Sequence, residues 1–115
     1  MKRGDVYWAD PVPRSGSEQT GRRPVVLMSH DGFTQNPGWR SIIVVPILTS
    51  ISQGKRGPTV VAIPGGVAGL MKSSVAVCHQ VTTLDRSKLT KRIGALSADF
   101  IRDLEGGIKA AMDLE

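Results

Sequence analysis

The sequence is poor in the residues that build disulfides and metal sites. It has one cysteine, Cys78, and two histidines, His30 and His79, in 115 residues. A single cysteine forms no internal disulfide, and a zinc site built on paired cysteines is excluded. No paired histidines and no clustered carboxylates stand at ligand spacing, so no metal and no cofactor are expected. The apolar neighbours Val75 and Val77 predict that Cys78 is a thiol of the core.

Long apolar runs are missing as well. The longest, residues 25–28 and 42–48, fall far short of the roughly 20 residues that span a bilayer. Lys2 and Arg3 are followed at once by a polar pair, so no signal peptide is expected. The phosphate-binding pattern Gly-x-x-x-x-Gly-Lys-Ser/Thr is absent. We therefore expect a cytoplasmic protein that does not enter the membrane.

Acidic residues are outnumbered. Fifteen Lys and Arg against ten Asp and Glu give a net charge of +5 and an isoelectric point near 9.9. Such an excess favours a polyanionic partner, either a nucleic acid or an acidic protein. Many of the cations fall in segments expected to be loops: Arg14, Arg22, Arg23, Arg40, Lys55 and Arg56. Loop cations on a rigid scaffold are suited to following a phosphate backbone.

Short strands separated by turn-rich loops make up most of the predicted structure. The strand-like segments are residues 5–10, 24–29, 41–47, 59–63, 74–81 and 91–96. The third is the strongest, because four of its residues in a row are β-branched. Five or six short strands in a chain of this length predict a mainly β (α+β) fold. We expect one domain, residues 1–115, that forms a small and strongly curved barrel.

Two helical segments are predicted. Asp85 can cap a brief helical turn through Leu89, and Ser97 can cap a C-terminal helix that runs to about Leu114. Apolar residues recur there at three- and four-residue intervals: Phe100, Ile101, Leu104, Ile108 and Met112. Gly106-Gly107 should cost this helix about 1 kcal/mol each relative to alanine, so its last turns are expected to kink or fray.

Polar residues stand at the ends of predicted strands. Arg22 and Arg23 precede a buried strand, and a guanidinium matches phosphate oxygens bidentately. Thr49 and Ser50 put two hydroxyls after the strongest strand. The alternatives are a solvated charge pair and an ordinary turn. Residues 17–19 in the first loop are, by themselves, only polar surface.

Five short motifs, taken together, point to a family. They are Arg3-Gly4-Asp5-Val6-Tyr7-Trp8, Gly16-Ser17-Glu18-Gln19, Gly21-Arg22-Arg23-Pro24-Val25-Val26, Pro46-Ile47-Leu48-Thr49-Ser50 and Gln80-Val81-Thr82-Thr83-Leu84-Asp85. In order and spacing they resemble the MazF/PemK toxin family, and the resemblance covers nearly the whole chain. It implies an SH3-like barrel that forms a homodimer. It also implies a cognate acidic, MazE-like antitoxin, whose partly disordered segment covers an RNA groove.

The resemblance further implies sequence-specific cleavage of single-stranded RNA, namely mRNA, without a metal, which inhibits translation and growth. The substrate's 2′-hydroxyl attacks the adjacent phosphate and leaves a 2′,3′-cyclic phosphate and a 5′-hydroxyl. Arg23 and Thr49 fall on the positions regarded as catalytic in the family. Arg23 is interpreted as an acid or charge stabiliser, since a guanidinium is a poor base at neutral pH. The general base stays open.

The sequence departs from the family pattern before Gln80. Many members carry an acidic residue there, and one branch adds an arginine two positions earlier. This chain has His79 and Val77 instead, so the Arg–Asp route is lost. His79 is a candidate base because imidazole titrates near pH 7. A packed or RNA-stacking histidine is the alternative, and His30, before Asp31, is interpreted as structural or RNA-facing.

Polar and charged side chains on or beside the motifs are expected to bind the RNA. The set is Ser17, Glu18, Gln19, Arg22, Asp31, Ser50, Lys55, Arg56 and Gln80. Trp39 could stack on a base or cover the barrel. Two other functions remain open at this point. One is a topoisomerase (DNA gyrase) poison on the same fold, and the other is an RNA-binding module without catalytic activity.

Overall fold

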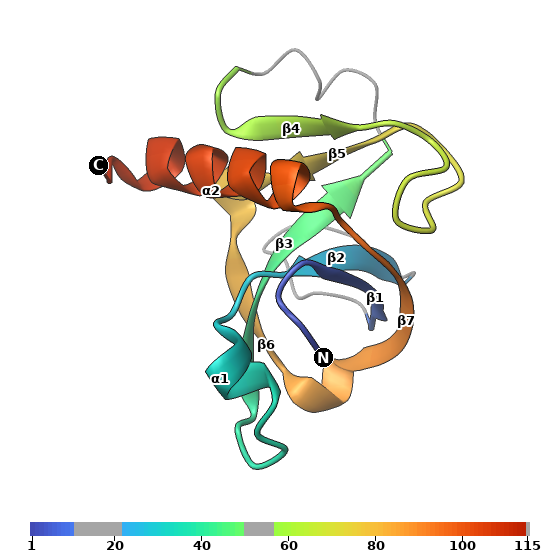
Figure 1. Cartoon of the computed structure of the whole chain (residues 1–115), viewed down its shortest axis with the longest axis vertical. Helices are drawn as coiled ribbons and strands as arrows, with labels where there is room; N and C mark the ends of the chain where they lie inside the picture. Colours follow the sequence, from blue (N-terminus) through green and yellow to red (C-terminus); the bar gives the residue numbers. More distant parts are fainter. Residues whose placement is uncertain (11–21, 50–56, 115) are drawn as a thin grey trace, which may run out of the picture.

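A computed structural model describes residues 1–10, 22–49 and 57–114 of the chain. The strands are β1 (Asp5–Ala9), β2 (Arg23–Leu27), β3 (Ser41–Leu48), β4 (Val60–Ile63), β5 (Ser74–Val77), β6 (Thr82–Asp85) and β7 (Leu89–Ala95). The helices are α1 (Asp31–Thr34) and α2 (Ala98–Met112), with 3-10 turns η2 (Cys78–Gln80) and η3 (Arg86–Lys88). Figure 1 shows α2 lying across the sheet and α1 at its far end.

The strands form one antiparallel sheet in the order β4-β5-β3-β2-β1-β7, and β6 also pairs with β3. Strand β3 organises it, because β6 pairs with its first half and β5 with its last two residues. The sheet bends there, with β1, β2 and β7 curled on one side and β4 and β5 on the other (Figure 1). Within the described ranges β4 and β7 are the two edge strands of this order, and they do not pair with each other. The sheet is thus curved and open.

The mainly β class with a C-terminal helix is confirmed, but the expected strand count was too low. The segment 74–81, predicted as one strand, is not one. It ends at Val77 as β5, turns through η2 where Val81 N donates to Cys78 O at 3.2 Å, and returns as β6. The turn is needed because β5 and β6 pair with different halves of the same strand. Seven strands are therefore present in the described part of the chain.

The helical caps behave as predicted. The Ser97 side chain accepts from Phe100 N at the start of α2, and the Asp85 side chain accepts from Ser87 N at η3. Leu104 of α2 is fully buried in a cluster that also contains Cys78. Cys78 is thus a core thiol, as expected, and burial raises its pKa to about 11. No helix of the described residues is long and apolar enough to cross a membrane.

The helix is not interrupted at Gly106-Gly107, since α2 runs continuously from Ala98 to Met112. The two glycines differ in surroundings. Gly106 is exposed, and a Cβ there would meet nothing within 4 Å. Gly107 is buried, and its Cβ would lie 2.6 Å from Cys78 Sγ. Gly107 therefore permits the close approach of α2 to η2, and packing compensates for its low helix propensity.

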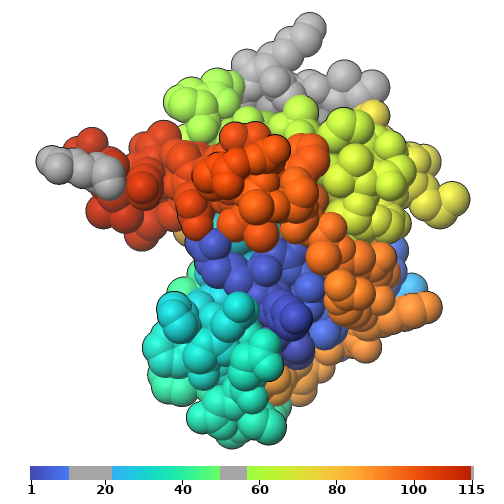
Figure 2. Space-filling view, in the orientation of Figure 1, coloured from blue at the N-terminus to red at the C-terminus, as the bar shows by residue number. Residues whose placement is uncertain are grey.

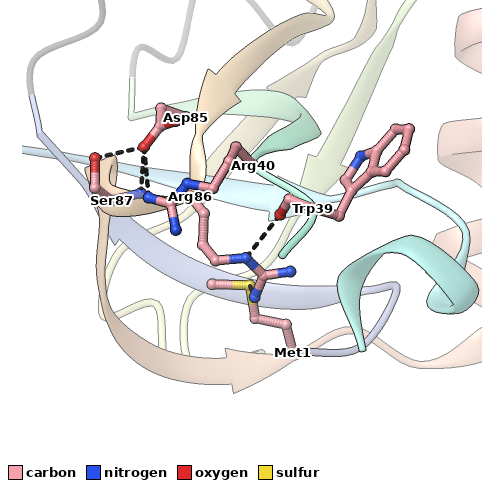
Figure 3. Close-up of polar contacts among 6 residues, drawn as sticks. All are labelled: Met1, Trp39, Arg40, Asp85, Arg86 and Ser87. Atoms are coloured by element: carbon pink, nitrogen blue, oxygen red, sulfur yellow. Dashed lines mark hydrogen bonds and ion pairs between the residues drawn. The ribbon is translucent and has the colours of Figure 1, made fainter. Parts of the chain in front are cut away.

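Arg86 holds the segment that contains α1, a helix that was not predicted. Its Nε donates to Trp39 O at 2.9 Å (Figure 3), and its Nη2 donates to the carbonyls of Thr34 and Asn36, each also at 2.9 Å. The guanidinium thus satisfies carbonyls that the single helical turn leaves free. Next to it Asp85 Oδ2 accepts from Arg40 Nη2 at 3.0 Å (Figure 3).

The Trp39 side chain packs against the segment that contains α1. Its ring stacks on Phe33 with centroids 4.4 Å apart, and its Nε1 donates to Ser41 O at 2.7 Å. It remains 42% exposed. Figure 2 shows the α1 segment protruding at the end of the molecule opposite α2 and the turn after β4.

Candidate active-site pocket

A pocket of about 560 Å³ lies where the start of β2 meets the end of β3. Its lining is Trp8, Arg22, Arg23, Pro24, Ile47, Leu48, Thr49, Gly69, Leu70, Met71, Lys72, Ser74 and Ile93. Arg23 and Thr49, predicted as a catalytic pair although 26 positions apart in the chain, therefore line the same pocket. Arg22 lines it as well.

Strand register explains why these residues meet. Strands β2 and β3 are antiparallel, with Val25 opposite Pro46. Continued by two residues, this register puts Arg23 opposite Leu48, the neighbour of Thr49. On the other side of β2, Trp8 pairs with Pro24. The arginine is thus carried by the sheet rather than by a free loop, which limits its movement.

One wall of the pocket is a turn that packs on β7. Ala68 and Gly69 have φ values of 56° and 80°, in the left-handed region. A Cβ at Gly69 would fall against the carbonyl oxygen of Ile93, and a Cβ at Gly94 would fall against the carbonyl of Ala68. The two backbones approach so closely only because both positions are glycine. The glycines after β4 therefore form a turn, and that turn carries Leu70 and Met71 to the pocket.

The pocket combines an apolar interior with cations. Leu70 is buried, whereas Met71 is 93% exposed. The guanidinium carbon of Arg22 lies 5.2 Å from the centroid of the Trp8 ring, a cation–π arrangement. Lys72 and Thr49 add further polar residues to the lining. An apolar cavity with a few convergent polar groups is the usual form of a binding site for a small ligand or part of a larger one.

The family model described as PemK-like, MazF-like toxin of type II toxin–antitoxin systems matches residues 2–112. The chain belongs to the PemK/MazF toxin family. The endoribonuclease MazF of Staphylococcus saprophyticus is 38% identical over 114 residues, which cover 99% of this chain and 92% of that protein. The endoribonuclease MazF2 of Mycobacterium bovis is 29% identical over 114 residues, 99% of this chain and 98% of that protein.

Solved MazF structures share the fold. The Mycobacterium tuberculosis toxin MazF-mt6 superposes with a TM-score of 0.77 at 25% identity, covering 96% of this chain and 98% of that one. A MazE–MazF complex from Deinococcus radiodurans matches with a TM-score of 0.77 at 23% identity, covering 100% and 97%. Because the identity of the second match is only 23%, it supports the shared fold alone.

His79, which replaces the acidic residue of many MazF/PemK members, does not line the pocket. It belongs to η2, is exposed, and shares a hydrogen bond of 2.8 Å between its Nδ1 and Thr59 Oγ1. Gln80, the next residue, is half-buried and also outside the lining. Its Oε1 is buried without a hydrogen-bond partner among the described residues. Within one chain, neither side chain is brought to Arg23 and Thr49.

Asp31 lies away from the pocket too. It belongs to α1, which follows β2 at the end opposite Arg23 (Figure 1). Its Oδ1 accepts from Arg3 N at 2.6 Å. The remaining predicted RNA-binding residues lie outside the described part of the chain, so their role stays a prediction. They are Ser17, Glu18, Gln19, Ser50, Lys55 and Arg56.

Sequence reasoning missed several residues of this pocket. Trp8 was named only as part of a family motif, and Leu70, Met71 and Lys72 carried no prediction. Nothing local to residues 64–72 indicates that they fold back on β7, so this wall had no sequence signal beyond its glycines.

Within the described ranges, no group of three or more His, Cys, Asp or Glu side chains could hold a metal ion.

Proposed function

We propose that this protein is the toxin of a type II toxin–antitoxin pair and a sequence-specific endoribonuclease that cuts single-stranded mRNA without a metal ion. The observation that carries the proposal is the shared pocket of Arg23 and Thr49. Family membership and the endoribonuclease names of its relatives support it. The site of action would be the cytoplasm, where mRNA is translated.

In the proposed reaction the 2′-oxygen of a ribose attacks the adjacent phosphorus, and the bond from phosphorus to the 5′-oxygen breaks. The 2′-hydroxyl loses its proton and the 5′-oxygen gains one. The products are a 2′,3′-cyclic phosphate and a 5′-hydroxyl. Negative charge builds on the non-bridging oxygens during attack, and fixed donors there lower the barrier.

Arg23 supplies the first donor in this proposal, and the Thr49 hydroxyl supplies the second. A guanidinium keeps its proton at neutral pH, so Arg23 acts as a charge stabiliser or acid rather than as the base. His79 is held by Thr59 outside the pocket lining. We therefore leave His79 out of the proton transfers.

Cleavage of a long defined RNA in excess chelator tests the proposal. The wild type should cut and leave the two end groups named above, and a single 2′-deoxy nucleotide on the 5′ side of a site should abolish cutting there. Arg23→Ala and Thr49→Ala should each lower the rate about 100- to 1,000-fold. Thr49→Ser keeps the hydroxyl and should retain most of it. Cutting that needs added metal, or that survives the 2′-deoxy change, contradicts the mechanism.

We also propose a homodimer and an acidic, MazE-like antitoxin whose partly disordered segment binds the toxin across its RNA groove. The net charge of +5 supports an acidic partner. A mycobacterial endoribonuclease of the same fold has been solved with its cognate antitoxin (TM-score 0.72, 19% identity, covering 100% of this chain and 95% of that one). Size-exclusion chromatography with light scattering tests the dimer, and a supercoiling assay alongside RNA cleavage tests against a gyrase poison.

A further inference from the structure

We propose that the pocket holds one unstacked nucleobase of the RNA beside the cleaved phosphate, with the Trp8 indole as its stacking surface. This inference rests on the proposed function and adds a specificity-determining residue to it. Trp8 was not among the predicted RNA-binding residues, and it enters through the geometry of the pocket.

The first argument is the composition of the lining. A site that bound only a phosphodiester would need donors and no apolar walls. This one has a large apolar set beside its cations: Trp8, Pro24, Ile47, Leu48, Leu70 and Ile93. A flat, weakly polar group attached to a phosphate satisfies both parts of the lining, and a nucleotide is such a group. At about 560 Å³ the cavity falls in the range of pockets that bury small ligands.

The second argument is the arrangement of Arg22 and Trp8. The Arg22 guanidinium is planar, and it lies over the indole ring at 5.2 Å from the centroid. Both side chains line the pocket, so the face of Trp8 that Arg22 covers already holds a planar cation and is the face on which a base would stack. A base that stacks there can displace Arg22 toward the phosphate backbone, or Arg22 can stack on the far side of the base. Either outcome keeps the cation beside the RNA.

The third argument is the contrast between the two side chains of the wall. Leu70 is buried at 6% exposure, and the Gly69 and Gly94 backbone contacts fix its turn on β7. Met71 follows it, is 93% exposed, and has three rotatable bonds and a polarizable sulfur. Leu70 thus gives the pocket a fixed inner surface, and Met71 gives it a flexible outer surface that can pack on a base entering from solvent.

Tryptophan fluorescence tests stacking directly, because the chain has only two tryptophans, Trp8 and Trp39. Trp39→Phe leaves Trp8 as the sole reporter. Titration with a short single-stranded oligoribonucleotide that carries a 2′-deoxy nucleotide at the cut should quench Trp8. An abasic nucleotide at one position next to the cut should remove the quenching, and abasic nucleotides elsewhere should not. The matched control, Trp8→Phe, reports Trp39 and should show no quenching.

Cleavage gives the second readout. Base–aromatic stacking contributes enough that Trp8→Leu should lower kcat/KM by about 5- to 150-fold. End-mapping should then show weaker preference at one nucleotide position next to the cut. Trp8→Phe should keep most of the activity and the preference. Met71→Ala changes an exposed residue, so it should fold normally and shift the preference at the same position.

The outcomes separate this inference from the proposed function. Failure of the wild type to cut RNA would overturn both. If the wild type leaves the expected ends, but Trp8 fluorescence is unchanged by every oligonucleotide and Met71→Ala keeps the cleavage pattern, only the base pocket is refuted. Quenching of Trp8 by an acidic apolar peptide and not by RNA would also refute it, because the occupant would then be a protein side chain.

Discussion

Replacing Gly107 with alanine is expected to destabilise the protein, while the same change at the adjacent Gly106 is expected to stabilise it. Both changes remove a glycine from the interior of α2, and each gains about 1 kcal/mol of helix propensity. At Gly106 nothing lies within 4 Å of the new Cβ, so this gain is the whole effect.

At Gly107 the same gain is opposed by a clash. The new Cβ would lie 2.6 Å from Cys78 Sγ and 3.0 Å from Cys78 Cβ. Both atoms belong to a buried residue, so relief requires α2 to move away from η2. Overpacking of this kind costs about 1–3 kcal/mol. The net change at Gly107 is thus a loss of up to about 2 kcal/mol, and the two variants should differ by about 1–3 kcal/mol.

Urea unfolding followed by circular dichroism measures this difference, with the midpoint as readout and the slope as a check that unfolding stays two-state. Cys78→Ala removes the sulfur and should recover part of the loss when combined with Gly107→Ala, so the double-mutant cycle should show favourable coupling. Equal stability of the two glycine variants, or additive effects of Gly107→Ala and Cys78→Ala, would refute the packing explanation.

Three further outcomes follow from single contacts. Arg86→Ala should lower the free energy of unfolding by about 1–3 kcal/mol, because carbonyls of the α1 segment lose a charged donor. The RNA cleavage sites should not change. A thermal stability equal to that of the wild type would contradict this role of Arg86. Burial raises the pKa of Cys78 to about 11, so its stabilising contribution is complete below about pH 9 and is lost as pH rises toward 11. At pH 8 iodoacetamide should modify Cys78 readily only in denaturant, and rapid modification of the native protein would disprove a buried thiol. His79→Ala should leave the pH–rate curve of RNA cleavage unchanged, and loss of its acidic limb would make His79 the base.

The elements predicted best were those whose signal is local. The β-branched run placed β3 within one residue of its observed end, and Ser97 marked the start of α2 correctly. The break between β5 and β6 was missed because no glycine or proline marks it, and β6 itself was not predicted because three of its four residues are polar. What separates them is pairing with opposite halves of β3, and that is a long-range property. The single turn of α1 is too short to show helical periodicity.

The residues of the candidate site were likewise predicted where their signal is local and missed where their position depends on long-range packing. Arg23 and Thr49 stand at strand ends that antiparallel register brings together, so strand reading and family resemblance agreed on them. Asp31 was grouped with them although it lies beyond the other end of β2. At about 3.3 Å per residue, a five-residue strand separates the two ends by well over 10 Å. Met71 could not be found, because its place in the pocket depends on how one turn packs on β7. Trp8 was missed because the strand pattern around it does not indicate which distant residues its ring meets.

The most direct test of Arg23 as the donor to the scissile phosphate compares it with its neighbour in the same pocket. Single-turnover cleavage of one defined RNA in excess chelator would be measured for Arg23→Ala and Arg22→Ala, each at saturating protein. Arg23→Ala should lose about 100- to 1,000-fold in the rate of the chemical step. Arg22→Ala should need more protein to saturate but then cut at close to the wild-type rate. Wild-type cutting by Arg23→Ala, or equal losses of the saturated rate in both variants, would contradict the assignment.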